Sequence, residues 1–563
     1  MYSLIEEPWI LAVDTTGEPL KVSLREVFDG SHKIERVRGD SPLQDYAITR
    51  LLLAIFWRAH SEKIELTPGS TFIFEDWFER TWEEISGQGS DPLSVMYLEK
   101  YAERFDLLDP NIPFMQVADL QLKDGSTRPV IGLVPEIQDD FFTMRAGEQK
   151  QDLSLDEAAR WLVYTQAYDY SGIKSGAVGD PRVKGGRGYP IGQGWTGLTG
   201  GVLVRGETLL HTLMLNTVQE ALLTPADLPV WERQPDGPAE RKNPFPQGAA
   251  DIATWQSRRL RLFAEEQRVV EILVCNGDKI PDAGANVMVD PMTPYRWSKN
   301  KSKRSLDVYF PRPFDQTRTM WRSLDALIVG ETDGGFDAKD KRPKRPRTLD
   351  SLASLSQRLD DDVIPEVLDV VLYSIQYGPQ ASSVATTFHS GLSVPVRLLI
   401  EENADLRERV RIAASQASEA GKALGIFQGN LFLAAGGEYE FRAELTDKFL
   451  ADLEPKFIEW LRTLSLPSQD TLEAMDQQLE QWQSVVRNAA ESIARAQLRG
   501  AGPRALAGRI VPGNDESSRG RLVSAGSAYG QLTQALNKSL PATVNKADTQ
   551  KPTTETQKEE IDD

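Results

Sequence analysis

From about residue 396 onwards this chain consists of long segments with helical periodicity and almost no proline. Proline inside a helix removes a backbone hydrogen bond and clashes with the preceding turn, so its scarcity permits unbroken helices. Apolar residues recur at steps of three and four, as expected for one buried face. One such stripe comprises Phe449, Leu453, Phe457, Trp460, Leu461 and Leu464. The segments 398–424, 439–464, 471–498 and 519–536 are therefore predicted to form a four-helix bundle.

The first 395 residues have a different texture. Helical stretches at 43–59 and 155–168 alternate with short strand-like runs at 202–204, 269–274 and 306–310, without a regular βαβ rhythm. This mixture predicts an α+β chain with a large N-terminal domain of irregular topology.

The predicted domain order follows from these textures. It is a mixed α/β domain over 1–395, the helical bundle over 396–540 and an acidic tail over 541–563. The tail has almost no large apolar residue, so we expect it to be disordered.

Charge and cysteine content limit the possible functions. The 563 residues carry 83 acidic and 64 basic side chains, a formal net charge of −19, which opposes general affinity for polyanions. Any contact with nucleic acid must then come from local basic segments. The single cysteine, Cys275, excludes an intramolecular disulfide, fits a reducing cytoplasm and is interpreted as a small buried apolar residue. No run of about eighteen apolar residues predicts a membrane span.

A glycine tract at 172–201 is the strongest candidate for a binding loop. It holds eleven glycines in thirty residues, and its cations include Lys174, Lys184 and Arg187. Glycine reaches positive φ and lets backbone N–H groups approach a ligand, and neighbouring cations favour phosphate. The tract therefore predicts a loop that faces a polyanion, and the alternative is an ordinary surface loop.

Two further basic segments interrupt the acidic background. Residues 296–304 hold five cations and are expected at the tip of a hairpin, because strand-like residues follow them. Residues 339–347 carry six cations, and their prolines indicate a mobile linker or exposed loop. Three basic segments in one acidic chain favour nucleic-acid binding, although each alone is typical of a solvated surface.

Signatures of catalysis are weak. Gly192, Gly194 and Gly197 satisfy G-x-G-x-x-G, but this fingerprint needs a strand before it and a helix after it, and here a loop precedes it and the strand-like GGVLV follows. The sequence contains no P-loop, no G-x-S-x-G and no H-E-x-x-H, and its four histidines lie far apart. We predict no catalytic residues, no metal and no cofactor.

Several segments together resemble a known family. They are EPWI (7–10), RFDLLDPNIPFMQV (104–117), GLTGGVLVRGETLLHTLMLN (197–216) and PQASS (379–383), followed by the helical bundle. In this order they resemble CasA, the large subunit of the type I-E Cascade complex of CRISPR immunity. The resemblance covers nearly all of residues 1–540.

The resemblance implies a non-catalytic subunit whose N-terminal domain recognises the protospacer-adjacent motif in duplex DNA. It also implies that this subunit starts strand separation for guide RNA pairing. The implied partners are double-stranded target DNA, the CRISPR guide RNA, other Cascade subunits that contact the bundle, and a recruited nuclease-helicase. The implied location is the cytoplasm, without a membrane.

Site residues carry over from the family by position. The family's glycine loop is similar to Gly197, Gly200 and Gly201, its basic hairpin lysine to Lys299 or Lys301, and its wedge to Gln380 and Ala381, with Pro379 in place of an asparagine. The cations Lys174, Lys184 and Arg187 are added as expected DNA contacts. The family's anchoring loop, near the 5′ end of the guide RNA, resembles 130–149 and contributes Phe141, Phe142 and Arg145.

Two other functions remain open at this stage. A scaffold protein would use the helical bundle to hold partners, and the basic segments would be incidental. A nucleotide-binding enzyme would use the glycine tract as its phosphate site.

Overall fold

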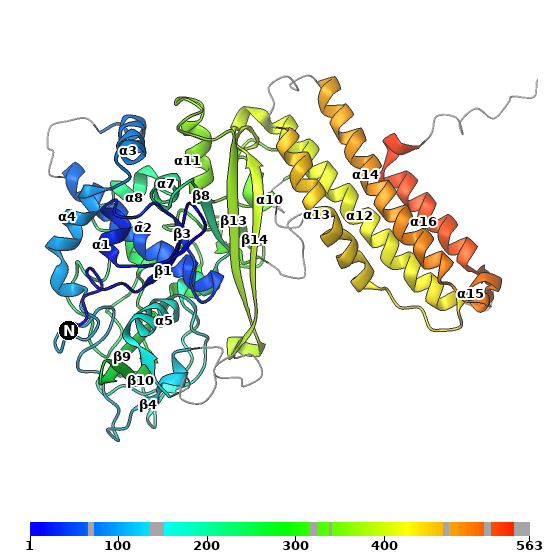
Figure 1. Ribbon diagram of the computed structural model, residues 1–563. Coiled ribbons are helices and arrows are strands. Elements are labelled where there is room, and N and C mark those ends of the chain that lie inside the picture. Colours follow the sequence, from blue (N-terminus) through cyan, green and yellow to red (C-terminus); the bar gives the residue numbers. More distant parts are fainter. Residues whose placement is uncertain are drawn as a thin grey trace, which may run out of the picture. The chain divides into compact units, whose positions relative to one another are not determined.

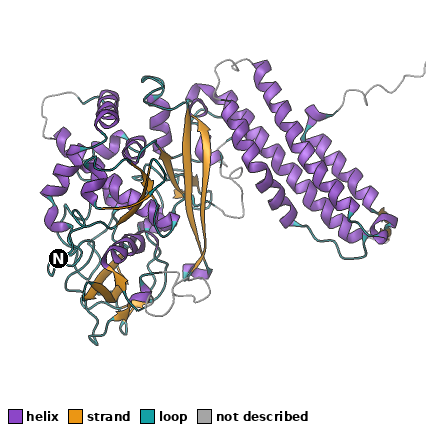
Figure 2. Cartoon of the chain, viewed as in Figure 1, coloured by secondary structure: helices purple, strands orange, loops and turns teal. Residues whose placement is uncertain are grey.

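The computed structural model describes residues 1–65, 72–134, 151–314, 324–336, 341–464, 472–511 and 520–544. Within these, the residues up to 404 form one structural unit and those from 405 onwards form a second. Helices and several small sheets occur together in the first unit, whereas the second is almost entirely helical (Figure 2). The fold class is α+β, as predicted.

A long buried helix, α2 (Pro42–Glu65), forms the core of the first unit. Nearly every side chain from Leu43 to Ser61 is buried, including two arginines. A helix buried on all sides needs neighbours all round, and α4, α5, α7, α8 and α9 pack against it. The predicted helix at 43–59 lies inside α2, and the one predicted at 155–168 is α5.

The remaining helices of this unit are short. They are α1 (Leu24–Phe28), α3 (Phe74–Gln88), α4 (Pro92–Lys100), α5 (Leu155–Tyr168), α6 (Trp195–Leu198), α7 (Leu209–Leu215), α8 (Gln219–Leu222), α9 (Ala249–Ala253), α10 (Asp325–Ile328) and α11 (Arg347–Leu355).

The sheet that matters most for the site contains a long hairpin. Strands β13 (Val367–Tyr377) and β14 (Val384–Pro395) pair antiparallel along their length, and β8 (Gly201–Arg205) pairs with the other edge of β13. The hairpin extends well beyond β8 (Figure 1). Tyr373 sits opposite Gly201 on one side and opposite His389 on the other.

The other described strands of the first unit form three further sheets. β10 is the centre of the largest, and Cys275 lies buried within it, where burial raises the pKa of the thiol to about 12. The strands are β1 (Ile10–Asp14), β2 (Pro19–Val22) and β3 (Ile34–Val37); β4 (Arg128–Pro129), β5 (Leu153–Ser154), β6 (Lys174–Ser175), β7 (Arg187–Gly188), β9 (Arg258–Glu265) and β10 (Arg268–Asn276); and β11 (Tyr295–Trp297) with β12 (Tyr309–Pro311).

The second unit contains the four predicted long helices. They are α12 (Ala404–Ala434), α13 (Ala443–Thr463), α14 (Leu472–Arg499) and α16 (Ala525–Ser539), with the short α15 (Pro503–Ala507) between the last two. All six residues of the predicted apolar stripe are buried. Phe457, Trp460 and Trp482 pack ring against ring, and the indole of Trp482 donates to the Ala413 carbonyl at 3.1 Å.

Two details at the end of this unit differ from the prediction. The helix expected from residue 519 begins at Ala525, and the strand β16 (Arg521–Val523) precedes it, paired with β15 (Arg509–Val511). Val523 is buried, and Ser524 starts the helix through a reciprocal capping box with Ser527. The expected tail from 541 begins with a short helical turn, η11 (Pro541–Thr543), which packs on α14. Residues 545–563 lie outside the described part of the chain.

Within the described residues, none of the helices combines the length and the apolar character needed to cross a bilayer.

Candidate nucleic-acid interface

The glycine tract begins with a small cationic hairpin. Between β6 and β7, Gly185 and Gly186 have φ values of 57° and 73°, and Lys184 and Arg187 exchange two backbone hydrogen bonds of 3.1 Å. Left-handed conformations at both central positions define the two-residue turn that fits the twist of a hairpin. The side chains of Lys184 and Arg187 are exposed, and neither forms an ion pair with another described residue. This tip therefore presents two uncompensated charges.

The tract ends in the short helix α6, which is fixed by a buried carboxylate. The indole of Trp195 donates to Asp290 at 2.6 Å, and Asp290 also pairs with Arg50 of α2 at 3.0 Å. Burial alone would raise the pKa of Asp290, but the Arg50 guanidinium and the hydrogen bonds hold it below its ordinary value. The carboxylate therefore stays charged and joins the central helix to the glycine tract.

The same carboxylate anchors the basic hairpin. Asp290 lies just before β11, and it accepts from the Met292 backbone and the Thr293 hydroxyl at 3.0 Å each. Tyr295 of β11 packs in one apolar cluster with Trp195 of α6. The base of the β11–β12 hairpin and the end of the glycine tract are therefore held together.

The loop between β11 and β12 carries the predicted cations. Lys299 and Lys301 are both exposed, and neither forms an ion pair with a described residue. The loop is ordered by its own backbone, since the Ser302 and Lys301 N–H groups both donate to the Ser298 carbonyl. The prediction that these cations lie at the tip of a hairpin is confirmed.

The three glycines expected to touch DNA are buried. A Cβ on Gly197 would lie 2.2 Å from Tyr377 Oη, one on Gly200 would lie 2.5 Å from the Arg312 carbonyl, and one on Gly201 would lie 2.4 Å from the Tyr46 ring. These distances are shorter than any real Cβ contact, so only glycine fits. Packing accounts for all three residues, and their contact with DNA stays a prediction.

The packing at Gly197 also locates the wedge. Tyr377 ends β13, and its hydroxyl donates to the Tyr168 carbonyl at 2.7 Å. Three residues later the turn reaches Gln380, which is exposed. The turn that carries the wedge therefore starts directly over α6.

The turn itself has an unusual backbone. Gln380 and Ala381 have φ values of 57° and 52°, a conformation that side-chain-bearing residues seldom adopt. Hydrogen bonds from Gly378 to the Ser383 carbonyl and from Ala381 to the Gly378 carbonyl, both 2.9 Å, close it. Strained backbone of this kind is concentrated at functional positions.

Lys174 has a different place from the other cations. Its ammonium pairs with Asp169 at 2.7 Å and lies 3.9 Å from the centre of the Tyr170 ring, and its side chain is 8% exposed. Asp169 pairs at the same time with the buried Arg258. Burial lowers the pKa of Lys174, and Asp169 opposes this shift. Lys174 therefore belongs to an internal ion cluster and offers no surface charge.

The second basic segment was expected to be a mobile linker or an exposed loop, and over its described part, 341–347, it is bonded to the rest of the first unit. Lys344 exchanges backbone hydrogen bonds with Tyr295 of β11, at 2.8 and 2.9 Å. Lys341 pairs with Asp307, and Arg345 is buried and bonded to the Leu399 carbonyl. Most of these cations already form ion pairs with carboxylates or hydrogen bonds with carbonyl groups of the protein, so they stabilise the fold.

Two other predictions have clear outcomes. The G-x-G-x-x-G match leads into α6, a helix of one turn, and then into β8, which pairs antiparallel with β13, so the βαβ context of a dinucleotide site is missing. Phe141, Phe142 and Arg145 lie outside the described residues.

Sequence reasoning missed the residues that assemble the site. Arg50 and Asp290 are 240 positions apart, and no local pattern connects them. Tyr377 stands two residues before the PQASS segment, so its position could have drawn attention to it.

Comparisons with known proteins agree with this arrangement. The model of the family CRISPR-associated protein Cse1 matches residues 3–493. The chain belongs to this family, and the resemblance to CasA is confirmed.

The crystal structure of Thermobifida fusca Cse1 is similar, with a TM-score of 0.81 and 34% identity over 96% of this chain and 98% of that one. A CRISPR-associated protein CasA/Cse1 of Thermus thermophilus is 28% identical over 378 residues, which span 64% of this chain and 65% of that relative. A chain of a CRISPR RNA-guided surveillance complex shares the fold, with a TM-score of 0.67 and 20% identity over 95% of this chain and 99% of that one.

The packing role of Gly201 is testable. We expect Gly201→Ala to lower the free energy of unfolding by about 1–3 kcal/mol, since the added methyl overpacks the Tyr46 ring. Gly391→Ala is the matched control, because Gly391 lies in the same sheet and its Cβ would meet nothing within 4 Å. Thermal unfolding measures both, and equal melting temperatures for the two variants would contradict the packing role.

The internal ion cluster makes a second prediction. Asp169→Asn leaves Lys174 and Arg258 buried without a counter-charge, so we expect a decrease of about 3–5 kcal/mol in unfolding free energy. Asp152→Asn breaks only the exposed pair with Arg268 and should cost about 0–1 kcal/mol. Chemical denaturation compares them, and a decrease at Asp169 no greater than at Asp152 would show that Lys174 is not held as described.

Proposed function

We propose that this protein is the non-catalytic subunit of a CRISPR RNA-guided surveillance complex that recognises the protospacer-adjacent motif in duplex DNA and begins strand separation. The observation that carries the proposal is the exposed Gln380 on a strained turn after β13. This turn starts over α6, and Trp195 of α6 packs with Tyr295 at the base of the cationic β11–β12 hairpin. Membership of the Cse1 family supports the same role.

Charge distribution supports a local rather than a general contact with DNA. The whole chain has a formal net charge of −19 and therefore repels DNA. The tip at Lys184 and Arg187 and the loop with Lys299 and Lys301 are exposed, and no carboxylate of the described residues pairs with them. Local attraction at these two places fits a protein that engages one short stretch of duplex.

The chemistry of the groove suits these residues. The minor groove offers mainly acceptor atoms, so ammonium groups and backbone N–H groups read it without a recognition helix. Such reading is degenerate, because A·T and T·A look alike there. We therefore expect several adjacent motifs to be accepted.

Gln380 and Ala381 are assigned to the wedge. A side chain inserted between base steps unstacks them at a cost of a few kcal/mol, which contacts with phosphates offset. Base pairing with the guide RNA then reads the sequence, and because that exchange is nearly balanced in energy, a small protein contribution decides whether unwinding proceeds. Gly197, Gly200 and Gly201 contribute by positioning. The first lets Tyr377 approach α6, the second leaves room for the segment after β12, and the third leaves room for Tyr46 of α2.

Partners follow from the family resemblance. They are the target duplex, the guide RNA, other subunits of the complex and a recruited nuclease-helicase. The loop with Phe141, Phe142 and Arg145 is proposed to anchor the subunit near the 5′ end of the guide RNA. The long helices of the second unit are proposed to contact neighbouring subunits.

The wedge role predicts a separation of binding from unwinding. In the assembled complex, we expect Gln380→Ala to lower the rate of target unwinding about tenfold or more, while affinity for the motif duplex changes less, because the initial groove contacts remain. Gln376→Ala is the control, since Gln376 is exposed on the same hairpin but lies within β13. Stopped-flow fluorescence of a base analogue next to the motif reports unwinding. Equal decreases in binding and unwinding would end the wedge assignment.

The cationic loop predicts a salt effect. Lys299→Glu with Lys301→Glu should weaken binding of the complex to motif duplexes and reduce the slope of log affinity against log salt by roughly two units, one for each phosphate that the loop no longer neutralises. Lys33→Glu with Lys123→Glu makes the same charge change at exposed sites outside the loop. An unchanged slope in the loop variant would favour the scaffold alternative.

A further inference from the structure

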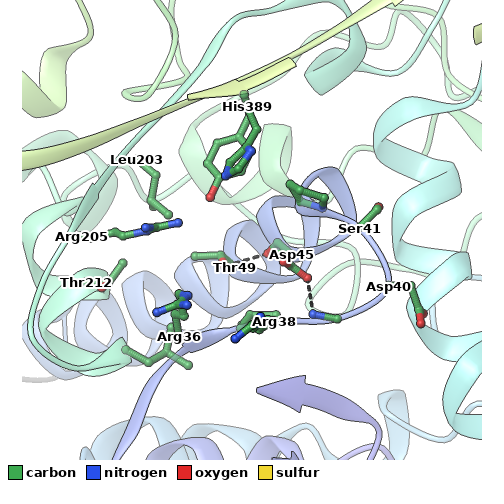
Figure 3. Close-up of a pocket in the computed structure, with 15 residues that line it drawn as sticks. Arg36, Arg38, Asp40, Ser41, Asp45, Thr49, Leu203, Arg205, Thr212 and His389 are labelled. Carbon is green, nitrogen blue, oxygen red and sulfur yellow. Dashed lines mark hydrogen bonds between the residues drawn. The ribbon is translucent and has the colours of Figure 1, made fainter. Parts of the chain in front are cut away.

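A second cationic feature of the first unit lies outside the proposed interface. It is a pocket of about 380 Å³ bounded by β3, the start of α2, β8 and the β13–β14 hairpin. Figure 3 shows Arg36, Arg38 and Arg205 around its open space, with His389 on the opposite side. The arginines come from two places in the sequence: Arg36 lies in β3 and Arg38 directly follows that strand, whereas Arg205 ends β8.

The three guanidinium groups are close enough to repel one another. Burial and then the charges of Arg205 and Arg38 lower the pKa of Arg36. Arg36 pairs with its neighbour Glu35, but neither Arg38 nor Arg205 forms an ion pair with any residue in the described ranges. Like charges gathered in a pocket destabilise it unless an anion binds there.

The acidic groups of the pocket do not cancel this charge. Asp40 is already paired with the buried Arg160 at 3.2 Å. Asp45 accepts from the Gly39 N–H at 2.6 Å, and burial raises its pKa to about 7, so its carboxylate is partly protonated near neutral pH. The pocket therefore keeps an excess of positive charge.

Further groups suit a bound oxyanion. Tyr373 is buried and stacks on Tyr46 with ring centres 4.6 Å apart. Burial raises the pKa of the Tyr373 hydroxyl, and the nearby charge of Arg205 opposes this shift. His389 faces Tyr373 across the strand pair, and burial followed by the charge of Arg205 lowers the pKa of this imidazole. The first turn of α2, a helix of 24 residues, adds the positive end of its dipole.

We propose that this pocket binds a phosphate group. Guanidinium groups offer planar pairs of N–H donors that match two oxygens of a phosphate, which an ammonium cannot do. Three such groups around one space, with a hydroxyl and an imidazole beside them, form a built site rather than a diffuse charged patch.

The phosphate could belong to a nucleic-acid backbone or to a free phosphate or nucleotide, and the position of the pocket on the hairpin distinguishes these two sources. Gln380 lies seven residues beyond Tyr373 on the same hairpin. Four of these steps lead to the end of β13, a span of roughly 13 Å at the rise of an extended strand, and the other three lie in the turn. A nucleic-acid strand that follows the hairpin from the wedge would bring a backbone phosphate to the pocket, and this source rests on the proposed function. A free phosphate or nucleotide would bind independently of it.

The test uses the full chain and two probes, inorganic phosphate and a short single-stranded oligonucleotide, each titrated by calorimetry. We expect Arg205→Gln and Arg38→Gln to weaken binding about tenfold each, because each removes charge-assisted hydrogen bonds. Lys33→Gln is the matched control, since Lys33 is exposed just before β3 and, among the described residues, forms an ion pair with the exposed Glu207 alone. Saturable binding of either probe that depends on Arg38 and Arg205 supports the site.

The pattern over the two probes identifies the source. Binding of inorganic phosphate indicates that a free phosphate suffices, and binding of the oligonucleotide alone indicates a strand backbone. Arg205→Lys keeps the charge but removes the planar donor pair, so it should also weaken binding while retaining the wild-type melting temperature. Equal affinities for wild type, Arg205→Gln and Arg205→Lys would overturn the proposal, as would the absence of saturable binding for both probes.

One variant distinguishes an error in the phosphate-pocket proposal from an error in the proposed DNA interface. Gln380→Ala should leave phosphate binding by the chain unchanged, because the turn lies outside the pocket lining. A decrease of phosphate binding in Gln380→Ala equal to that in Arg205→Gln would overturn the pocket.

Discussion

The buried pair of Arg50 and Asp290 determines where the rest of the first unit can lie. One partner sits on the central helix, and the other precedes the basic hairpin and holds the indole of Trp195. A buried ion pair adds little net stability over apolar packing, but removal of one partner leaves a charge stranded in the core. The main effect of this ion pair is therefore to fix the positions of the segments that it joins. It forces the glycine tract and the cationic hairpin to leave the core side by side.

Glycine has two separate uses within one tract. At Gly185 and Gly186 the backbone is left-handed, so a tight turn can form at the surface. At Gly197, Gly200 and Gly201 the backbone is ordinary, but aromatic rings and a carbonyl group occupy the space that a Cβ would need. Composition alone does not separate these two uses, because all five residues are glycines of the same tract.

The parts of the fold that depend on local pattern were predictable. The helices of the second unit follow from apolar spacing, and the basic loop at Lys299 follows from cations between strand-like runs. The parts of the fold that depend on contacts between residues far apart in the sequence were not predictable. Tyr46 meets Gly201, and the pocket arginines Arg36 and Arg205 converge, only after the chain folds. Lys174 was misjudged, although its partner Asp169 stands five residues away, because a sequence does not reveal which cations are already neutralised.

The left-handed pair at Gln380 and Ala381 has a thermodynamic consequence. Hydrogen bonds within the turn impose this backbone, and the two strands behind it are paired along their length, so the shape exists before any ligand arrives. A loop that had to be ordered on contact would lose conformational entropy at that moment and so weaken the complex. Here that loss is incurred during folding. The tip of this hairpin is preorganised. Binding energy is therefore not needed to order the tip and can be used to distort the partner.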